Sequence, residues 1–202
     1  MASVNPSYCV KNLDYLFISK VRIKTIKYFL FNPENPLHLR GLVRELSEEI
    51  NAIRRELIRL EEVGFVKSEV RGNRKFFLLN KGYVFLDELM GLFHKSFGIG
   101  GALLNDIGKL GDVNFIVLTG SFTYFVPPNK DIIDLVVIGN VNVEMLTQIV
   151  SEAEKKLNRE INYTVMKNGD FLLKKKRRDL FVMQLLLSKK ILVVGNYEEL
   201  VA

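Results

Sequence analysis

Basic side chains gather in two short segments of the N-terminal half. Residues 50–63 have helical spacing, and one face of that helix presents an asparagine and three arginines: Asn51, Arg54, Arg55 and Arg59. A turn-like segment further along adds three cations: Arg71, Arg74 and Lys75. Guanidinium groups bind phosphates and guanine edges, and an asparagine amide pairs with adenine. These residues could contact nucleic acid, or form a solvated face partly paired with Glu56, Glu61 and Glu62.

A second group of residues could hold phosphate and metal. Gly120-Ser121 follows a strand-like run, and Asp134 lies in the next one. A Gly-Ser turn lets backbone amides approach phosphate, and two carboxylates two residues apart on a strand would hold a divalent cation. Position 132 is isoleucine, and Asp131 is expected to face away because adjacent strand residues point to opposite faces. We therefore expect no catalytic metal and no bound cofactor.

The basic segments belong to a predicted arrangement of three helices and a hairpin. Apolar periodicity predicts helices over 19–31, 38–46 and 50–63, then strands over 65–70 and 75–79. The turn at 71–74 places Gly72 and Asn73 where positive φ is expected. This is a winged helix-turn-helix, in which the last helix enters the DNA major groove and the hairpin contacts the sugar-phosphate backbone.

Three motifs carry a resemblance to a known family. RGLVRELS at 40–47, AIRRELIRLEEVGFV at 52–66 and RGNRKFFLLN at 71–80 resemble the winged helix-turn-helix of ArsR-like prokaryotic regulators. The resemblance implies double-stranded DNA as partner and a homodimer. It does not imply metal sensing, because the cysteine ligands are missing. A further predicted helix over 83–97 either supplies the dimer contact or packs between domains, and we favour packing.

A glycine cluster at 98–101 marks the predicted boundary between domains 1–97 and 98–202. Beyond it, the pattern predicts helices over 100–110, 142–157 and 168–187. It also predicts four strands: 113–118, 132–138, 161–166 and 190–194. Strands mixed with crossover helices indicate a mixed sheet with flanking helices. The expected fold class is α+β / α/β.

The Gly-Ser pair and the interval of eleven residues to position 132 resemble the minimal nucleotidyltransferases, as do segments 159–164, 171–173 and 190–200. The chain departs from that pattern in three places. Position 132 is isoleucine, and the strand 160–165 lacks a third aspartate. The bulk of Thr123-Tyr124-Phe125 should obstruct the approach of phosphate. Gly120, Ser121 and Asp134 thus form a vestigial nucleotide site, and we do not expect an enzyme. An active nucleotidyltransferase and an antitoxin-like partner of a toxin stay open as alternatives.

Charge and composition limit the function classes. The net charge is +6, and residues 1–96 hold 16 Lys and Arg against 11 Asp and Glu. This excess favours a polyanionic partner or merely solubilises the surface. A single cysteine, Cys9, with His38 and His94 makes no zinc site. The basic run 174–178 is expected to be a solvated helix face rather than a second nucleic-acid patch.

No uncharged apolar run long enough to span a membrane and no signal peptide is evident, so a cytoplasmic protein without a membrane partner is expected. Together these patterns predict a DNA-binding transcriptional regulator. Its second domain would serve dimerisation, binding of a protein partner or ligand sensing.

Overall fold

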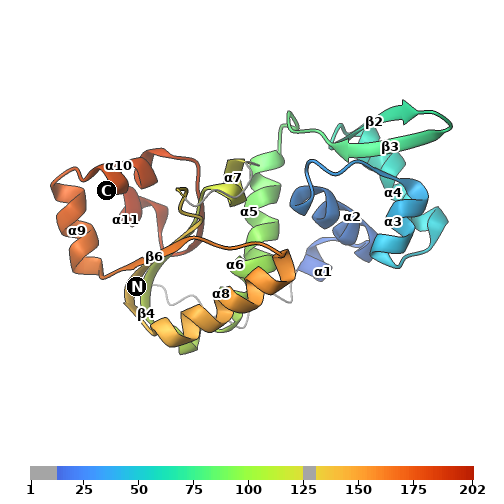
Figure 1. The fold of residues 1–202 in the computed structure, drawn as a ribbon. Helices are drawn as coiled ribbons and strands as arrows, with labels where there is room; N and C mark the ends of the chain where they lie inside the picture. The colour runs from blue at the N-terminus through green and yellow to red at the C-terminus, as the bar shows by residue number, and fades with distance from the viewer. Residues whose placement is uncertain (1–12, 125–130) are drawn as a thin grey trace. The chain divides into compact units, whose positions relative to one another are not determined.

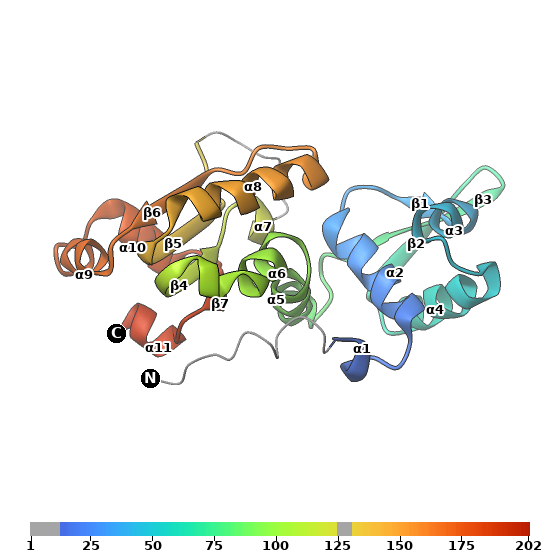
Figure 2. The ribbon, with the colours of Figure 1, turned by 90° about the horizontal axis from the view of Figure 1, so that it is seen from below.

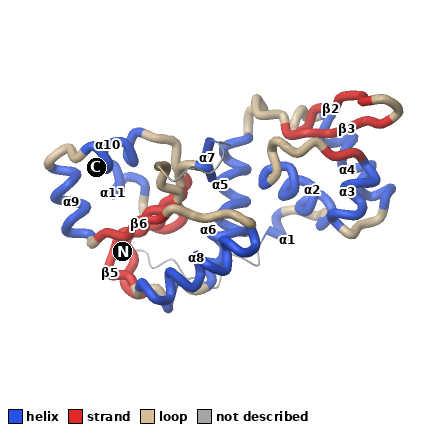
Figure 3. Tube along the Cα trace, viewed as in Figure 1, coloured by secondary structure: helices blue, strands red, loops and turns tan. Residues whose placement is uncertain are grey.

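The computed structural model of the chain describes residues 13–124 and 131–202. Contacts divide it into two compact units that meet in sequence between Phe93 and His94, four residues before the predicted boundary. Each unit holds its own sheet, so the fold is mixed α and β with two sheets, as predicted (Figure 3).

The first unit combines helices with a small sheet (Figure 1). Its elements are α1 (Leu13–Leu16), α2 (Lys20–Phe31), β1 (Leu37–His38), α3 (Leu39–Leu46), α4 (Ile50–Glu62), β2 (Val66–Arg71) and β3 (Arg74–Leu79). Side chains cap two of the helices: Ser19 accepts from the Arg22 amide and Glu49 from the Ala52 amide. Such caps satisfy amides that have no partner within the helix.

The small sheet has the order β1-β3-β2 and is antiparallel throughout. Arg71 pairs with Arg74, which leaves Gly72 and Asn73 as a two-residue turn. Gly72 has a φ of 61°, whereas Asn73 does not take positive φ, so the expectation for Asn73 was wrong. Glycine alone at positive φ in the first central position is typical of a type II′ turn.

Helices α2, α3 and α4 bury their apolar stripes together with the sheet. The most deeply buried side chains of this unit include Phe29, Leu42, Ile53, Leu57 and Leu79. Because these stripes fix the rotation of each helix, they also fix which side chains face solvent.

The second unit is built around a four-stranded sheet. Helix α5 (Leu86–Ser96) crosses the point of division and leads into it. The remaining elements are α6 (Gly98–Asn105), η2 (Ile107–Lys109), β4 (Gly111–Leu118), α7 (Ser121–Tyr124), β5 (Leu135–Val141), α8 (Val143–Leu157), β6 (Tyr163–Met166), α9 (Asn168–Lys176), α10 (Leu180–Leu187), β7 (Ile191–Val194) and α11 (Tyr197–Val201).

The strand order is β6-β5-β4-β7, and only β5 and β6 are parallel. The sheet is therefore mixed, as predicted. One difference matters for the site: the strand expected over 132–138 begins only at Leu135, so residues 131–134 form the segment that enters it.

Helices cover both faces of this sheet. Helices α9, α10 and α11 pack on the face that carries Val117, Val136 and Ile138, and α8 lies on another side (Figures 1 and 2). Residues of the opposite face, such as Ile116 and Val137, are also fully buried. Burial on both faces explains why these strands read as continuous apolar runs. None of the helices in residues 13–124 and 131–202 combines the length and the hydropathy that a membrane-spanning segment requires.

Candidate nucleic-acid interface and the Gly120 turn

Helix α4 buries one stripe of side chains and exposes another. Ile53, Leu57 and Leu60 face the core together with Glu56. The exposed side carries the four residues predicted from the sequence: Asn51, Arg54, Arg55 and Arg59. Their position on the outer face follows directly from the packing of the apolar stripe.

A groove of about 570 Å³ runs between α4, the start of α3 and the tip of the β2–β3 hairpin. Charged and polar side chains contribute much of its lining: His38, Arg40, Arg54, Glu61, Arg74 and Lys75. Of the seven predicted residues, this groove brings together Arg54, Arg74 and Lys75. Asn51, Arg55, Arg59 and Arg71 do not line it, although all four are exposed in the same unit.

Glu56 holds one of the predicted arginines. Its carboxylate is only 6% exposed and accepts a hydrogen bond from Arg22 Nε at 2.8 Å and another from Arg59 Nη1 at 3.3 Å. A buried carboxylate needs such partners because its desolvation is costly. Arg59 is therefore partly committed to the protein's own structure.

Glu61 holds a second predicted cation. Lys75 Nζ lies 2.7 Å from its carboxylate, and the Ser68 hydroxyl also donates to it. The hydrogen bond from Lys75, followed by that from Ser68, lowers the pKa of Glu61 below its ordinary value. Lys75 also lies over the Phe77 ring, 5.2 Å from its centroid. These contacts tie the hairpin to α4.

The other predicted residues differ in how far they are engaged. Arg71 pairs with Glu69 and lies over the Phe76 ring, and Arg54 donates to the Asn51 side chain at 3.1 Å. In the part of the chain that the structure describes, Arg55 and Arg74 form no ion pair. Their positive charge is the most available for an external anion.

Arg40 is a groove residue that the sequence-based prediction missed. It is exposed in the first turn of α3 and lines the groove with Arg54 and Arg74. The first strand, β1, pairs with β3 and thereby brings the start of α3 to the hairpin. A strand of two residues leaves no alternation to detect, so apart from the basic residue itself no sequence pattern indicates this proximity.

The second predicted site lies at the turn between β4 and α7. Gly120 has a φ of 54°, and a Cβ there would lie 2.7 Å from Ile132 Cγ2 and 2.8 Å from Asp134 Oδ1. Only glycine permits both this backbone conformation and this close approach. Gly120, Ser121 and Asp134 are thus brought together, as the spacing indicated.

Asp134 is almost completely buried and fully engaged. Its Oδ1 accepts hydrogen bonds from the Ser121 amide, at 2.9 Å, and from the Ser121 hydroxyl, while the Asn162 amide donates to Oδ2. Arg159 Nη1 lies 3.5 Å from the same Oδ2. The Asp134 carboxylate therefore serves as an anchor for the turn and has an internal cation as its counter-charge.

Arg159 and His94 complete a buried cluster around Phe122. The Arg159 guanidinium lies over the Phe122 ring at 4.6 Å, and His94 meets that ring edge-on at 5.5 Å. Burial lowers the pKa of Arg159, and Asp134 opposes that effect. Burial, with a smaller contribution from the charge of Arg159, lowers the pKa of His94 to about 4. His94 is therefore neutral at neutral pH.

Two expectations about this turn need correction. Asp131 lies in a turn before β5, so strand alternation does not apply to it, and it lines a cavity of about 300 Å³ together with Gly120 and Ile132. Thr123 does not obstruct that cavity, because it is buried and its hydroxyl donates to the Gly120 carbonyl. The Tyr124 side chain and Phe125 lie outside the described residues.

Neither site contains an evident metal centre. Among residues 13–124 and 131–202, no group of three or more His, Cys, Asp or Glu side chains is placed to hold a metal ion. Cys9 lies outside the described residues.

Comparison with known proteins finds a partial similarity to a regulator. The chain is 31% identical over 72 residues to an uncharacterized HTH-type transcriptional regulator of Methanocaldococcus jannaschii. That match covers 36% of this chain and only 18% of the relative's own length. No family model matches, and no solved structure matches significantly. Over about a third of its length, this chain is therefore similar to a helix-turn-helix regulator.

Proposed function

We propose that the protein is a DNA-binding transcriptional regulator that uses a winged helix-turn-helix. The observation that carries this proposal is the groove in which α4, the start of α3 and the hairpin tip present Arg40, Arg54 and Arg74 together. Three arginines from three separate elements on one exposed surface suit a polyanion. The similarity to a helix-turn-helix regulator supports the same assignment.

In this proposal the exposed face of α4 enters the major groove. Arg55 and the Asn51–Arg54 pair contact base edges, since arginine pairs with guanine and asparagine with adenine. Arg74 and Arg40 contact phosphates on either side and set the orientation. Arg59 and Lys75 have smaller roles, because Glu56 and Glu61 already hold them.

The second unit is proposed to be a nucleotidyltransferase-like domain without catalytic activity. Metal-assisted phosphoryl transfer needs carboxylates that are free to hold cations. Asp134 is instead buried against Ser121 and Arg159. The domain would then serve dimerisation, partner binding or ligand sensing.

The DNA proposal is tested with the full chain and a duplex selected from random sequence. We expect saturable binding that weakens with salt, and a loss of affinity of about tenfold or more in Arg55→Ala/Arg74→Ala. A Lys155→Ala/Lys156→Ala variant removes the same charge from exposed positions on α8 and is the matched control. Equal affinity of the wild type and the arginine double variant at low salt would contradict the proposal.

Nucleotidyl transfer is the second candidate, and one observation favours it: Asp131 lines the cavity beside Gly120. The protein is incubated with each labelled nucleoside triphosphate, magnesium or manganese, and candidate acceptors. We expect neither label transfer nor release of pyrophosphate. Turnover that disappears in Asp134→Asn or in Asp131→Asn would place the protein among the enzymes.

A further inference from the structure

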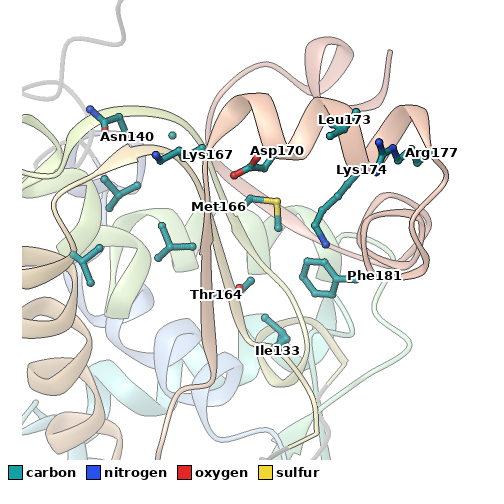
Figure 4. A pocket seen from close by; sticks show the side chains of 14 residues that line it. Ile133, Asn140, Thr164, Met166, Lys167, Asp170, Leu173, Lys174, Arg177 and Phe181 are labelled. Carbon is teal, nitrogen blue, oxygen red and sulfur yellow. The ribbon is translucent and has the colours of Figure 1, made fainter.

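A second cleft in the second unit borders the cavity at the Gly120 turn, with which it shares Ile133 and Phe181, and has no role in either proposed function. It measures about 880 Å³ and lies where strands β5 and β6 meet helices α9 and α10 (Figure 4). Its volume falls within the range of sites that hold small organic ligands, about 300–1,000 Å³.

The floor of the cleft is apolar. Thr164 and Met166 pair with Val136 and Ile138, so they project on the sheet face where α9 and α10 pack. Because β6 is an edge strand, the helices do not cover it completely, and all four of its residues remain partly exposed. Met166 and Phe181 contribute apolar surface that water or a ligand can reach (Figure 4).

The rim of the cleft is basic. Lys167, Lys174 and Arg177 line it, against a single carboxylate from Asp170. In the described part of the chain, Lys167 and Arg177 form no ion pair, and Lys174 reaches Asp179 only at 3.5 Å. Figure 4 shows the Lys174 side chain extending from α9 toward Phe181. A cation thus stands beside the apolar floor.

We propose that this cleft binds a small amphipathic anion: an apolar chain or ring that carries one carboxylate or phosphate. The apolar body would cover Met166 and Phe181, which removes their exposed surface from water. The anionic group would lie between Lys174 and Arg177, where positive charge exceeds negative. A neutral or cationic molecule of the same shape would lack the attraction between the anionic group and these two cations.

The probes are octanoate and octyl phosphate, with octyltrimethylammonium and octanol as charge controls. The chain has five methionines, so methyl-labelled methionine gives few NMR signals, and Met166→Leu identifies the one in the cleft. We expect octanoate or octyl phosphate to shift the Met166 signal saturably, while Met90 in the first unit stays unchanged. Comparison of the two probes tells carboxylate from phosphate recognition.

Charge variants on one helix test the anion contact. Arg177→Glu should weaken octanoate binding about tenfold, because it reverses a charge beside the bound anion. Lys176→Glu makes the same charge change at an exposed position of α9 that does not line the cleft, and should change affinity less than twofold.

Three results would overturn the proposal. The first is equal binding of octyltrimethylammonium or octanol, which would leave only apolar contact. The second is the absence of a Met166 shift with both octanoate and octyl phosphate. An acidic peptide that shifts the amide signals of β6, while neither anion shifts Met166, belongs to this second result. The third is a Met166 signal that changes with protein concentration alone, which would mean that a second copy of the chain covers the cleft.

Discussion

Arg55 and Arg74 are exposed on the first unit and form no ion pair within the described residues, whereas Asp134 and Arg159 of the second unit face each other at 3.5 Å in a largely buried cluster. The two regions hold similar residue types but use them differently. At the first, the charges are solvated and available to a partner. At the second, they satisfy one another. A charge that already has a buried partner is evidence of structure, and an exposed one without a partner is better evidence of binding.

Removal of the buried carboxylate tests whether Asp134 is structural. Asp134→Ala leaves Arg159 without its counter-charge and the Ser121 donors without their acceptor, and removal of one partner of a buried ion pair is strongly destabilising. We expect a loss of about 3 kcal/mol in the free energy of unfolding of the full chain, measured by urea denaturation. Asp131→Ala, at an exposed position in the same turn, should cost less than about 1 kcal/mol. Equal costs would show that Asp134 is no anchor.

His94 adds a dependence on pH to the same cluster. Its pKa is about 4 in the folded chain, against an ordinary value of 6.5. The unfolded chain therefore binds more protons between these values, and stability falls as the pH drops from about 6.5 toward 4. Between pH 7 and pH 5 we expect a loss of about 2 kcal/mol, reduced or absent in His94→Gln. Parallel unfolding curves for the two proteins over this pH range would contradict the burial of a neutral histidine.

On the exposed surface, Arg55 and Arg59 form a matched pair on one helix. Arg55 has no ion pair in the described chain, whereas Arg59 donates to Glu56. Arg55→Ala should cost about 1–3 kcal/mol in affinity for the selected duplex and relax the sequence preference at one position. Arg59→Ala should cost less than half as much. Titrations of both variants at one salt concentration decide this, and a larger loss in Arg59→Ala would reverse our ranking.

The long elements could be predicted from the sequence, because their apolar periodicity repeats over several turns. The helices predicted over 19–31 and 142–157 correspond to α2 and α8, and each observed helix begins one residue later than predicted. The strand β1 and the helix α7 were missed, since two and four residues are too few to show a period. The strand predicted over 132–138 begins only at Leu135, so the expectation that Asp131 faces away by strand alternation was wrong.

The grouping of site residues was only partly visible. Gly120, Ser121 and Asp134 could be assigned to one site from their spacing. The partners that hold a charge within the protein lie far away in the sequence: Arg159 lies 25 residues after Asp134, and Arg22 lies 34 residues before Glu56. Such pairs depend on tertiary packing, which no local pattern reports. Only the structure therefore shows whether an arginine is held by a carboxylate of the protein or is available to an external anion.

Lys75 and Glu61 test whether an exposed ion pair holds a cation to the fold. Their ion pair is exposed, with 48% and 32% of the side chains accessible, so its contribution to stability should be only about 0.2–1 kcal/mol. A double-mutant cycle with Lys75→Met and Glu61→Gln measures the coupling free energy, which should fall in 1 M salt because exposed charges are screened.

In DNA titrations, Arg74→Ala should lower the salt slope by about one unit. Lys75→Met should lower it less, because Glu61 already neutralises that lysine in the free protein. An equal change in slope would mean that Lys75 leaves Glu61 for the DNA, and that an exposed ion pair on this surface does not commit a cation to the fold.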